Sequence, residues 1–68
     1  MNVVLNGDPA QLPEGATMKD AVLATGAHES LRGLAAALDG EVVPRMSWGD
    51  TALGEGARIE VLQAVQGG

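Results

Sequence analysis

The last two residues, Gly67 and Gly68, are the part of this sequence best suited to chemistry. Glycine adds no side chain, so a tail over residues 66–68 could thread Gln66 and Gly67 into a narrow site on another protein. The reacting group would be the α-carboxylate of Gly68, which is ionised at neutral pH and can attack a phosphoryl group without a general base. The alternative interpretation is an inert, frayed chain end.

Other residues with catalytic or metal-binding chemistry are rare. The chain has no cysteine, which excludes disulfides, thiolate zinc sites and cysteine nucleophiles. Its one histidine, His28, excludes a multi-histidine metal site and is interpreted as a solvated loop residue. The carboxylates are scattered, which argues against a carboxylate metal cage. We therefore expect no bound metal or cofactor, and no active site belonging to this chain alone.

Length, charge and aromatic content limit the classes of partner. A chain of 68 residues is expected to be a single small domain over residues 1–68, with little room for a deep cleft. Nine acidic and four basic residues give a net charge of −5, which repels phosphate backbones. The one aromatic residue, Trp48, cannot form a base-stacking platform. The sequence thus predicts no nucleic-acid partner, whereas an acidic surface suits solubility and encounter with a basic protein.

No segment is expected to enter a membrane. The longest apolar run, Leu34–Leu38, is far shorter than the ~20 residues that a spanning helix needs. The first five residues lack the basic region of a signal peptide and meet a turn sequence at once. A cytoplasmic location is the resulting expectation.

The first β-hairpin is predicted around Asn6-Gly7. This pair favours the left-handed backbone of a two-residue hairpin turn, and it follows a short apolar run. Strands are therefore predicted over Asn2–Leu5 and about Ala10–Leu12, after which Pro13 breaks the ladder.

A second hairpin is predicted around Asp39-Gly40, with Pro44 ending its second strand. The preceding residues Leu34–Leu38 are rich in alanine, and propensity alone favours a helix there. Five residues between two turn signals are too few for a comfortable helix, so strands are predicted over Leu34–Leu38 and Glu41–Val43.

Two short helical segments are predicted as well. Thr17 can cap a helix, with Asp20 three residues on, and Gly26 fits the end of that helix. Residues 45–48 are expected to form a single helical turn. Trp48 at its end is interpreted as a plug at the edge of the core, and Arg45 as making either a local contact or a partner contact.

The clearest strand is predicted over Arg58–Val65. Alternation places Ile59 and Val61 on the core face, and it places Leu62 and Ala64 on the opposite face beside the tail. We interpret these two apolar residues as a partner-docking patch, with acidic Glu60 at its rim to steer encounter. Scattered surface apolar residues with no role are the alternative.

The predicted element order is β-β-α-β-β-β, with minor helical turns in the loops. A sheet with one main helix packed across one face is a two-layer α+β domain.

Three segments resemble one family closely. They are Asp39–Trp48, with its Val-Pro-Arg and tryptophan, the Gly54–Glu60 turn and strand, and the ending Gln63–Gly68. Together they resemble the ThiS family, the sulfur carriers of thiamine biosynthesis, and the first hairpin and the helix start match that family in position. Asp39 stands where the family usually has asparagine, and Gln66 is less typical.

This resemblance implies a ubiquitin-like β-grasp with a mixed sheet of about five strands. It also implies that a ThiF-like adenylating enzyme, similar to ubiquitin-activating enzymes, uses ATP and Mg²⁺ to form an acyl-adenylate on Gly68. A sulfur-donor persulfide protein would then leave a thiocarboxylate there. A ThiG-like thiazole synthase would use that sulfur to build the thiazole ring. The chain would be a co-substrate, consumed and recharged, and a monomer when free.

Three alternatives stay open. Sulfur carriers of other pathways, such as the small subunit of molybdopterin synthase or carriers for cysteine synthesis, also end in Gly-Gly or share the chemistry. Glu29-Ser30-Leu31 is similar to the attachment site of acyl carrier proteins, in which Ser30 would hold phosphopantetheine, although those proteins are helical bundles. A ubiquitin-like interaction module with an inert tail is the third.

Overall fold

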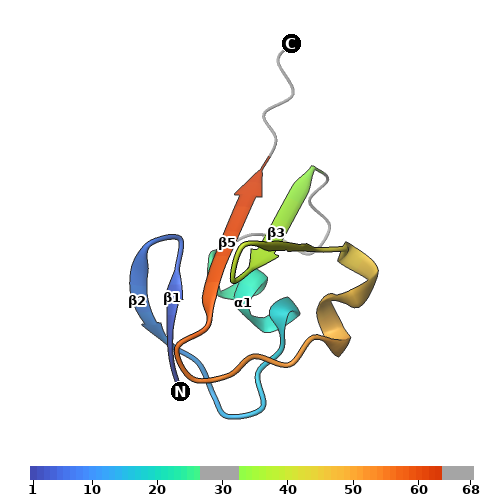
Figure 1. Cartoon of the computed structure of the whole chain (residues 1–68). Helices are drawn as coiled ribbons and strands as arrows, with labels where there is room; N and C mark the ends of the chain where they lie inside the picture. Colours follow the sequence, from blue (N-terminus) through green and yellow to red (C-terminus); the bar gives the residue numbers. More distant parts are fainter. Residues whose placement is uncertain (27–32, 64–68) are drawn as a thin grey trace.

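The computed structural model describes residues 1–26 and 33–63, in which five strands form one sheet and α1 crosses one face of it (Figure 1). The strand order is β2-β1-β5-β3-β4. The elements are β1 Asn2–Leu5, β2 Asp8–Gln11, α1 Met18–Ala24, β3 Leu34–Leu38, β4 Glu41–Val43, the 3-10 helix η1 Arg45–Asp50 and β5 Arg58–Gln63. The predicted α+β class, with a mixed five-stranded sheet and one main helix, is confirmed. None of the described helices is long and apolar enough to cross a membrane.

The last strand of the described chain, β5, lies at the centre of the sheet. It runs parallel to β1, with Val4 opposite Arg58, and antiparallel to β3, with Ala36 opposite Val61. Both hairpins, β1–β2 and β3–β4, are antiparallel. The strand that leads into residues 64–68 is therefore hydrogen-bonded on both sides.

The first residue of each hairpin turn does more than turn the chain. Asn6 and Asp39 both have φ of 50°, in the left-handed region that asparagine and aspartate tolerate best among residues with a Cβ. The Asn6 side-chain oxygen accepts a hydrogen bond from the Val61 backbone N–H at 2.8 Å, and that of Asp39 accepts one from the Arg58 N–H at 3.0 Å. Both turns are thus tied to β5. Aspartate at position 39 thus meets the same backbone requirement as asparagine at position 6.

The prediction for the second strand was wrong at both ends. β2 spans Asp8–Gln11 instead of about Ala10–Leu12, because a two-residue turn lets pairing start at once, with Leu5 opposite Asp8. Pro9 fits within it because β2 is an edge strand, where a missing N–H need not cost a ladder bond. Leu12 lies beyond the strand and is buried in the core.

The helix begins and ends as the sequence predicts. The Thr17 backbone N–H donates to the Asp20 carboxylate at 2.8 Å, which satisfies one of the free donors at the helix start. Gly26 follows the helix with φ of 89°, where glycine lacks the steric cost of a Cβ. The face between these ends buries Met18, Ala21 and Val22.

A single apolar core lies between α1 and the sheet. It is a cluster of buried hydrophobic side chains from the strands, both helices and the loops between them. They are Val3, Leu12, Ala16, Met18, Ala21, Val22, Ala36, Trp48, Leu53, Ala57, Ile59 and Val61. Trp48 closes one edge of this core, and its indole N–H donates to the Val43 carbonyl at 2.8 Å. The prediction that Trp48 plugs the core edge is confirmed.

The helical turn predicted at residues 45–48 is longer in the structure. η1 spans Arg45–Asp50, with Thr51 as its C-cap. The Thr51 hydroxyl donates to the Ser47 carbonyl at 2.7 Å and its N–H donates to the Trp48 carbonyl at 3.4 Å, and these bonds stabilise the last turn.

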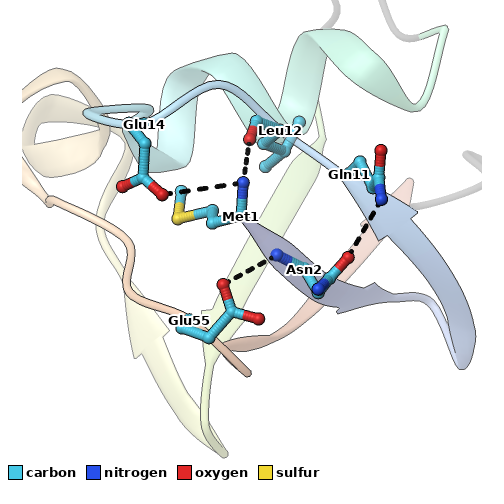
Figure 2. Close-up of polar contacts among 6 residues, drawn as sticks. All are labelled: Met1, Asn2, Gln11, Leu12, Glu14 and Glu55. Atoms are coloured by element: carbon cyan, nitrogen blue, oxygen red, sulfur yellow. Dashed lines mark hydrogen bonds and ion pairs between the residues drawn. The ribbon is translucent and has the colours of Figure 1, made fainter.

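Polar contacts fix Met1 and the first residue of β1, Asn2, to two neighbouring segments (Figure 2). The Met1 amino group donates to the Leu12 carbonyl at 2.7 Å and lies 3.9 Å from the Glu14 carboxylate. The Asn2 backbone N–H donates to the Glu55 carboxylate at 3.0 Å. β1 is therefore held both to the end of its own hairpin and to the loop that precedes β5.

Candidate functional site

Side chains along β5 alternate between the core and the outer face of the sheet. Ile59 and Val61 are 1% and 9% exposed, whereas Leu62 is 65% exposed and Glu60 is exposed beside it. The two-residue period of a strand explains this division. Leu62 and Glu60 thus lie on the outer face, as the alternation predicted.

The sheet register extends the apolar surface around Leu62. Ala35 of β3 is directly opposite Leu62, Ala37 is opposite Glu60, and Val42 of β4 is opposite Ala37. Directly paired residues point to the same side of a sheet. Ala35, Ala37, Val42 and Leu62 therefore form one continuous apolar surface, here called the outer-face patch.

Sequence reasoning missed Val42 as a member of the outer-face patch, along with Ala35 and Ala37. Val42 is 75% exposed, more than Leu62. The strand Glu41–Val43 has three residues, two of them adjacent valines. The two-residue alternation of a strand therefore cannot tell which valine faces the core and which faces solvent. The pairing of Val42 with Ala37 decides it, and that pairing depends on the register of the whole hairpin.

A shallow hollow of about 360 Å³ adjoins the outer-face patch. It lies between the β1–β2 turn and β5, and Val4, Arg58, Glu60 and Leu62 are among the residues that line it. One end of β5 therefore presents charges of both signs, and the other end presents an apolar side chain. This arrangement suits a protein surface better than a small apolar ligand.

The predicted reactive tail lies outside the described residues. Ala64, Gln66, Gly67 and Gly68 all fall in the segment 64–68, as does the end of the strand predicted to reach residue 65. Their roles stay predictions. The chain links them to the patch, since β5 ends at Gln63, one residue after Leu62. A partner that covers the outer-face patch is thus only a few residues away from the tail.

The described residues gather no metal-binding cluster. Within residues 1–26 and 33–63, no three His, Cys, Asp or Glu side chains come together in a group that could hold a metal ion. His28 and Ser30 lie outside these residues.

Comparison with known proteins assigns the family. The model of the ThiS family matches residues 3–68, nearly the whole chain. The chain belongs to the ThiS family. This result confirms the resemblance seen in the sequence motifs, and the match includes the Gly67-Gly68 ending. No curated protein matches the sequence.

Two solved structures share the fold of this ThiS-family chain. A crystal structure of the thiamine biosynthesis protein (ThiS) from Geobacter metallireducens has a TM-score of 0.79 and 26% identity, with 100% of both chains covered. An NMR solution structure of a thiamine biosynthesis protein from the same organism has a TM-score of 0.78 and 26% identity, covering 100% of this chain and 88% of that one. The fold is thus the ubiquitin-like β-grasp, and not the helical bundle that an acyl carrier at Ser30 would require.

Proposed function

We propose that this chain is a sulfur carrier of thiamine biosynthesis and that the carboxylate of Gly68 carries the sulfur. The observation that carries the proposal is the match of the ThiS family model over residues 3–68, which spans the sheet and the Gly-Gly ending. The similarity to thiamine biosynthesis proteins over the full length of the chain supports the pathway. The chain acts as a co-substrate in the cytoplasm and is a monomer when free.

The first step is activation of the tail by a partner adenylating enzyme. A Gly68 carboxylate oxygen attacks the α-phosphorus of ATP, the bond to pyrophosphate breaks, and an acyl-adenylate forms. ATP and Mg²⁺ are bound by the partner and not by this chain. Glycines at positions 67 and 68 let the backbone approach the nucleotide closely, because no Cβ intervenes.

The second step replaces adenylate with sulfur. The terminal sulfur of a persulfide on a donor protein attacks the acyl carbon, loses its proton, and expels AMP. A thiol then cleaves the S–S bond of the acyl disulfide, which leaves a thiocarboxylate on Gly68 and a disulfide on the donor side. The chain contains no cysteine, so no thiol of its own competes in this exchange.

The third step hands the sulfur to thiazole synthase, which incorporates it into the thiazole ring. The carrier is released with a carboxylate and can be recharged. The same outer-face patch would dock both enzymes in turn, with Leu62 and Ala64 as apolar contacts and Glu60 at the rim. Docking there supports tail chemistry because Leu62 lies one residue before the end of β5.

The test is the intact mass of the full chain after incubation with the adenylating enzyme, ATP, Mg²⁺ and a persulfide donor with thiol. We expect an oxygen-to-sulfur exchange that maps to the C-terminal peptide. The matched control lacks Gly68 and should gain no sulfur. Its terminal carboxylate, on Gly67, would stop one residue short of the nucleotide in the partner's active site. Sulfur gained equally by the shortened chain would contradict the assignment to Gly68.

A second readout assigns the pathway. Charged carrier is added to thiazole synthase and its small-molecule substrates, and thiazole formation is followed by chromatography. One thiazole formed for each carrier discharged supports the thiamine branch. Discharge that occurs only with a molybdopterin or cysteine-synthesis acceptor would keep the carrier role and overturn the pathway.

A further inference from the structure

A second surface feature lies on the helix side of the molecule, where α1 and η1 are in contact. Between them is a groove of about 340 Å³. Its lining comes from both helices and consists of Lys19, Val22, Leu23, Arg45, Met46, Trp48 and Gly49. We call it the α1–η1 groove. Figure 1 shows η1 in gold beside α1, away from residues 1–11.

The α1–η1 groove combines a buried apolar floor with an exposed apolar rim. Val22 and Trp48 are almost completely buried and form the floor, whereas Leu23 is 41% exposed and Met46 is 95% exposed. Exposing large apolar side chains to water is unfavourable, and contiguous examples commonly mark interaction sites. Methionine suits such a site because its flexible thioether adapts to different partner shapes.

The charge at the α1–η1 groove is opposite to that of the whole chain. Both charged residues that line it, Lys19 and Arg45, are basic, in a chain with only four basic residues and a net charge of −5. The Arg45 guanidinium lies 5.6 Å from the centre of the Trp48 ring, a cation–π distance that keeps this charge over the apolar floor.

We propose that the α1–η1 groove docks a segment of a partner protein that places carboxylates next to a bulky apolar side chain. The carboxylates would face Lys19 and Arg45, and the apolar side chain would pack between Met46 and Trp48. The volume of about 340 Å³ is at the lower end of the range for small-molecule pockets and suits one or two side chains. The inference does not depend on the proposed sulfur chemistry.

The groove and the outer-face patch lie on opposite sides of the sheet. α1 packs its buried residues Met18 and Val22 against the inner face, whereas Leu62 projects from the outer face. A segment in the α1–η1 groove would therefore leave the outer-face patch open. The carrier could be held by one protein through its helix side while another works on its tail.

The experiment uses a random-peptide phage library against the immobilised full-length chain, followed by titration of a synthesised peptide. We expect selected peptides to be enriched in aspartate or glutamate beside leucine, methionine, phenylalanine or tryptophan. The NMR shift changes that the peptide causes in the chain should map to Lys19, Leu23 and Met46. Affinity should fall about tenfold or more in Arg45→Glu, the fold-change expected for loss of a central charged contact.

The matched control is Arg58→Glu, the same charge reversal at an exposed residue of β5. It should keep peptide affinity within about twofold, whereas Met46→Asp should abolish binding. Thermal unfolding of each variant confirms that it folds. Peptides without acidic and apolar enrichment, equal losses in Arg45→Glu and Arg58→Glu, or shifts confined to the sheet would each overturn the proposal. So would a dimer of the chain itself that Met46→Asp disrupts, since the occupant would then be a second copy.

Discussion

At the scale of single residues, Asn6 joins two structural roles in one side chain. Its backbone takes the left-handed conformation of the first turn, with φ of 50°, and its side-chain oxygen accepts a hydrogen bond from the Val61 N–H at 2.8 Å. The two residues are 55 positions apart in the chain. Asn6 thus both forms the first turn and connects the first hairpin to the central strand, β5.

We expect Asn6→Ala to lower the free energy of unfolding by about 1–3 kcal/mol, because it places a less tolerant residue at positive φ and leaves the Val61 N–H without its acceptor. Urea unfolding followed by circular dichroism measures this change. The control Asn6→Gly tolerates the positive φ and removes only the side-chain hydrogen bond. Its free energy of unfolding should therefore fall less than that of Asn6→Ala. Equal stability of Asn6→Ala and the parent chain would contradict the assigned role.

At the scale of elements, β5 organises both the fold and the candidate site. Its inner side supplies Ile59 and Val61 to the core, and its outer side supplies Glu60 and Leu62 to the surface. Its backbone pairs with β3 along Ile59–Gln63 and with β1 at Arg58 and Ile59. Changes on its outer side should therefore affect binding far more than folding.

Leu62→Asp should weaken binding to the adenylating enzyme about tenfold or more and change thermal stability little, because the side chain is already 65% exposed. Val42→Asp tests the patch that the register reveals and should weaken binding in the same way. Isothermal titration calorimetry measures both. Ala24→Asp, the same kind of change at an exposed residue of α1 outside both surfaces, is the matched control and should bind normally. Unchanged affinity in both patch variants would exclude docking on this face.

Elements with a local sequence signal could be predicted well. Asn6-Gly7, Asp39-Gly40 and the Thr17 cap marked the turns and the helix start, because each depends on neighbours within a few residues. The family and its fold followed from the motifs of the second hairpin and the ending. The start of β2 and the exposure of Val42 could not be predicted, since both depend on strand register, which pairing across the sheet determines.

The α1–η1 groove is a surface feature that likewise could not be predicted from the sequence. Lys19 and Arg45 are separated by the whole second hairpin region of the sequence, and only the packing of η1 against α1 brings them to one groove. No periodicity or motif connects them. The gathering of charge at one place is a tertiary property, and a count of basic residues cannot reveal it.

At the scale of the whole molecule, net charge should control how fast the carrier finds its partners. A net charge of −5 on 68 residues acts over distances comparable to the Debye length, about 8 Å at physiological ionic strength. Long-range attraction raises association rates more than it lengthens the lifetime of a complex. We therefore expect the acidic surface to affect the association rate, and the outer-face patch to affect the lifetime of the complex.

The association rate constant with the adenylating enzyme should fall several-fold when salt is raised from low to physiological concentration, while the dissociation rate changes little. Stopped-flow fluorescence of Trp48 or of a labelled partner measures both rates. Glu60→Gln should reduce this salt dependence more than Asp50→Asn, which removes the same charge on η1 at the other side of the molecule. A rate constant that does not depend on salt would show that charge has no part in encounter.

The central position of β5 also has a mechanical consequence. Tension drawn along this strand from Gln63 pulls against two ladders at once, the parallel one with β1 and the antiparallel one with β3. A force along the strand axis loads the hydrogen bonds of these ladders in shear. If a partner draws residues 64–68 into its active site, as proposed above, the force would reach β5 at Gln63 and be resisted by the pairing of β5 with β3 and β1.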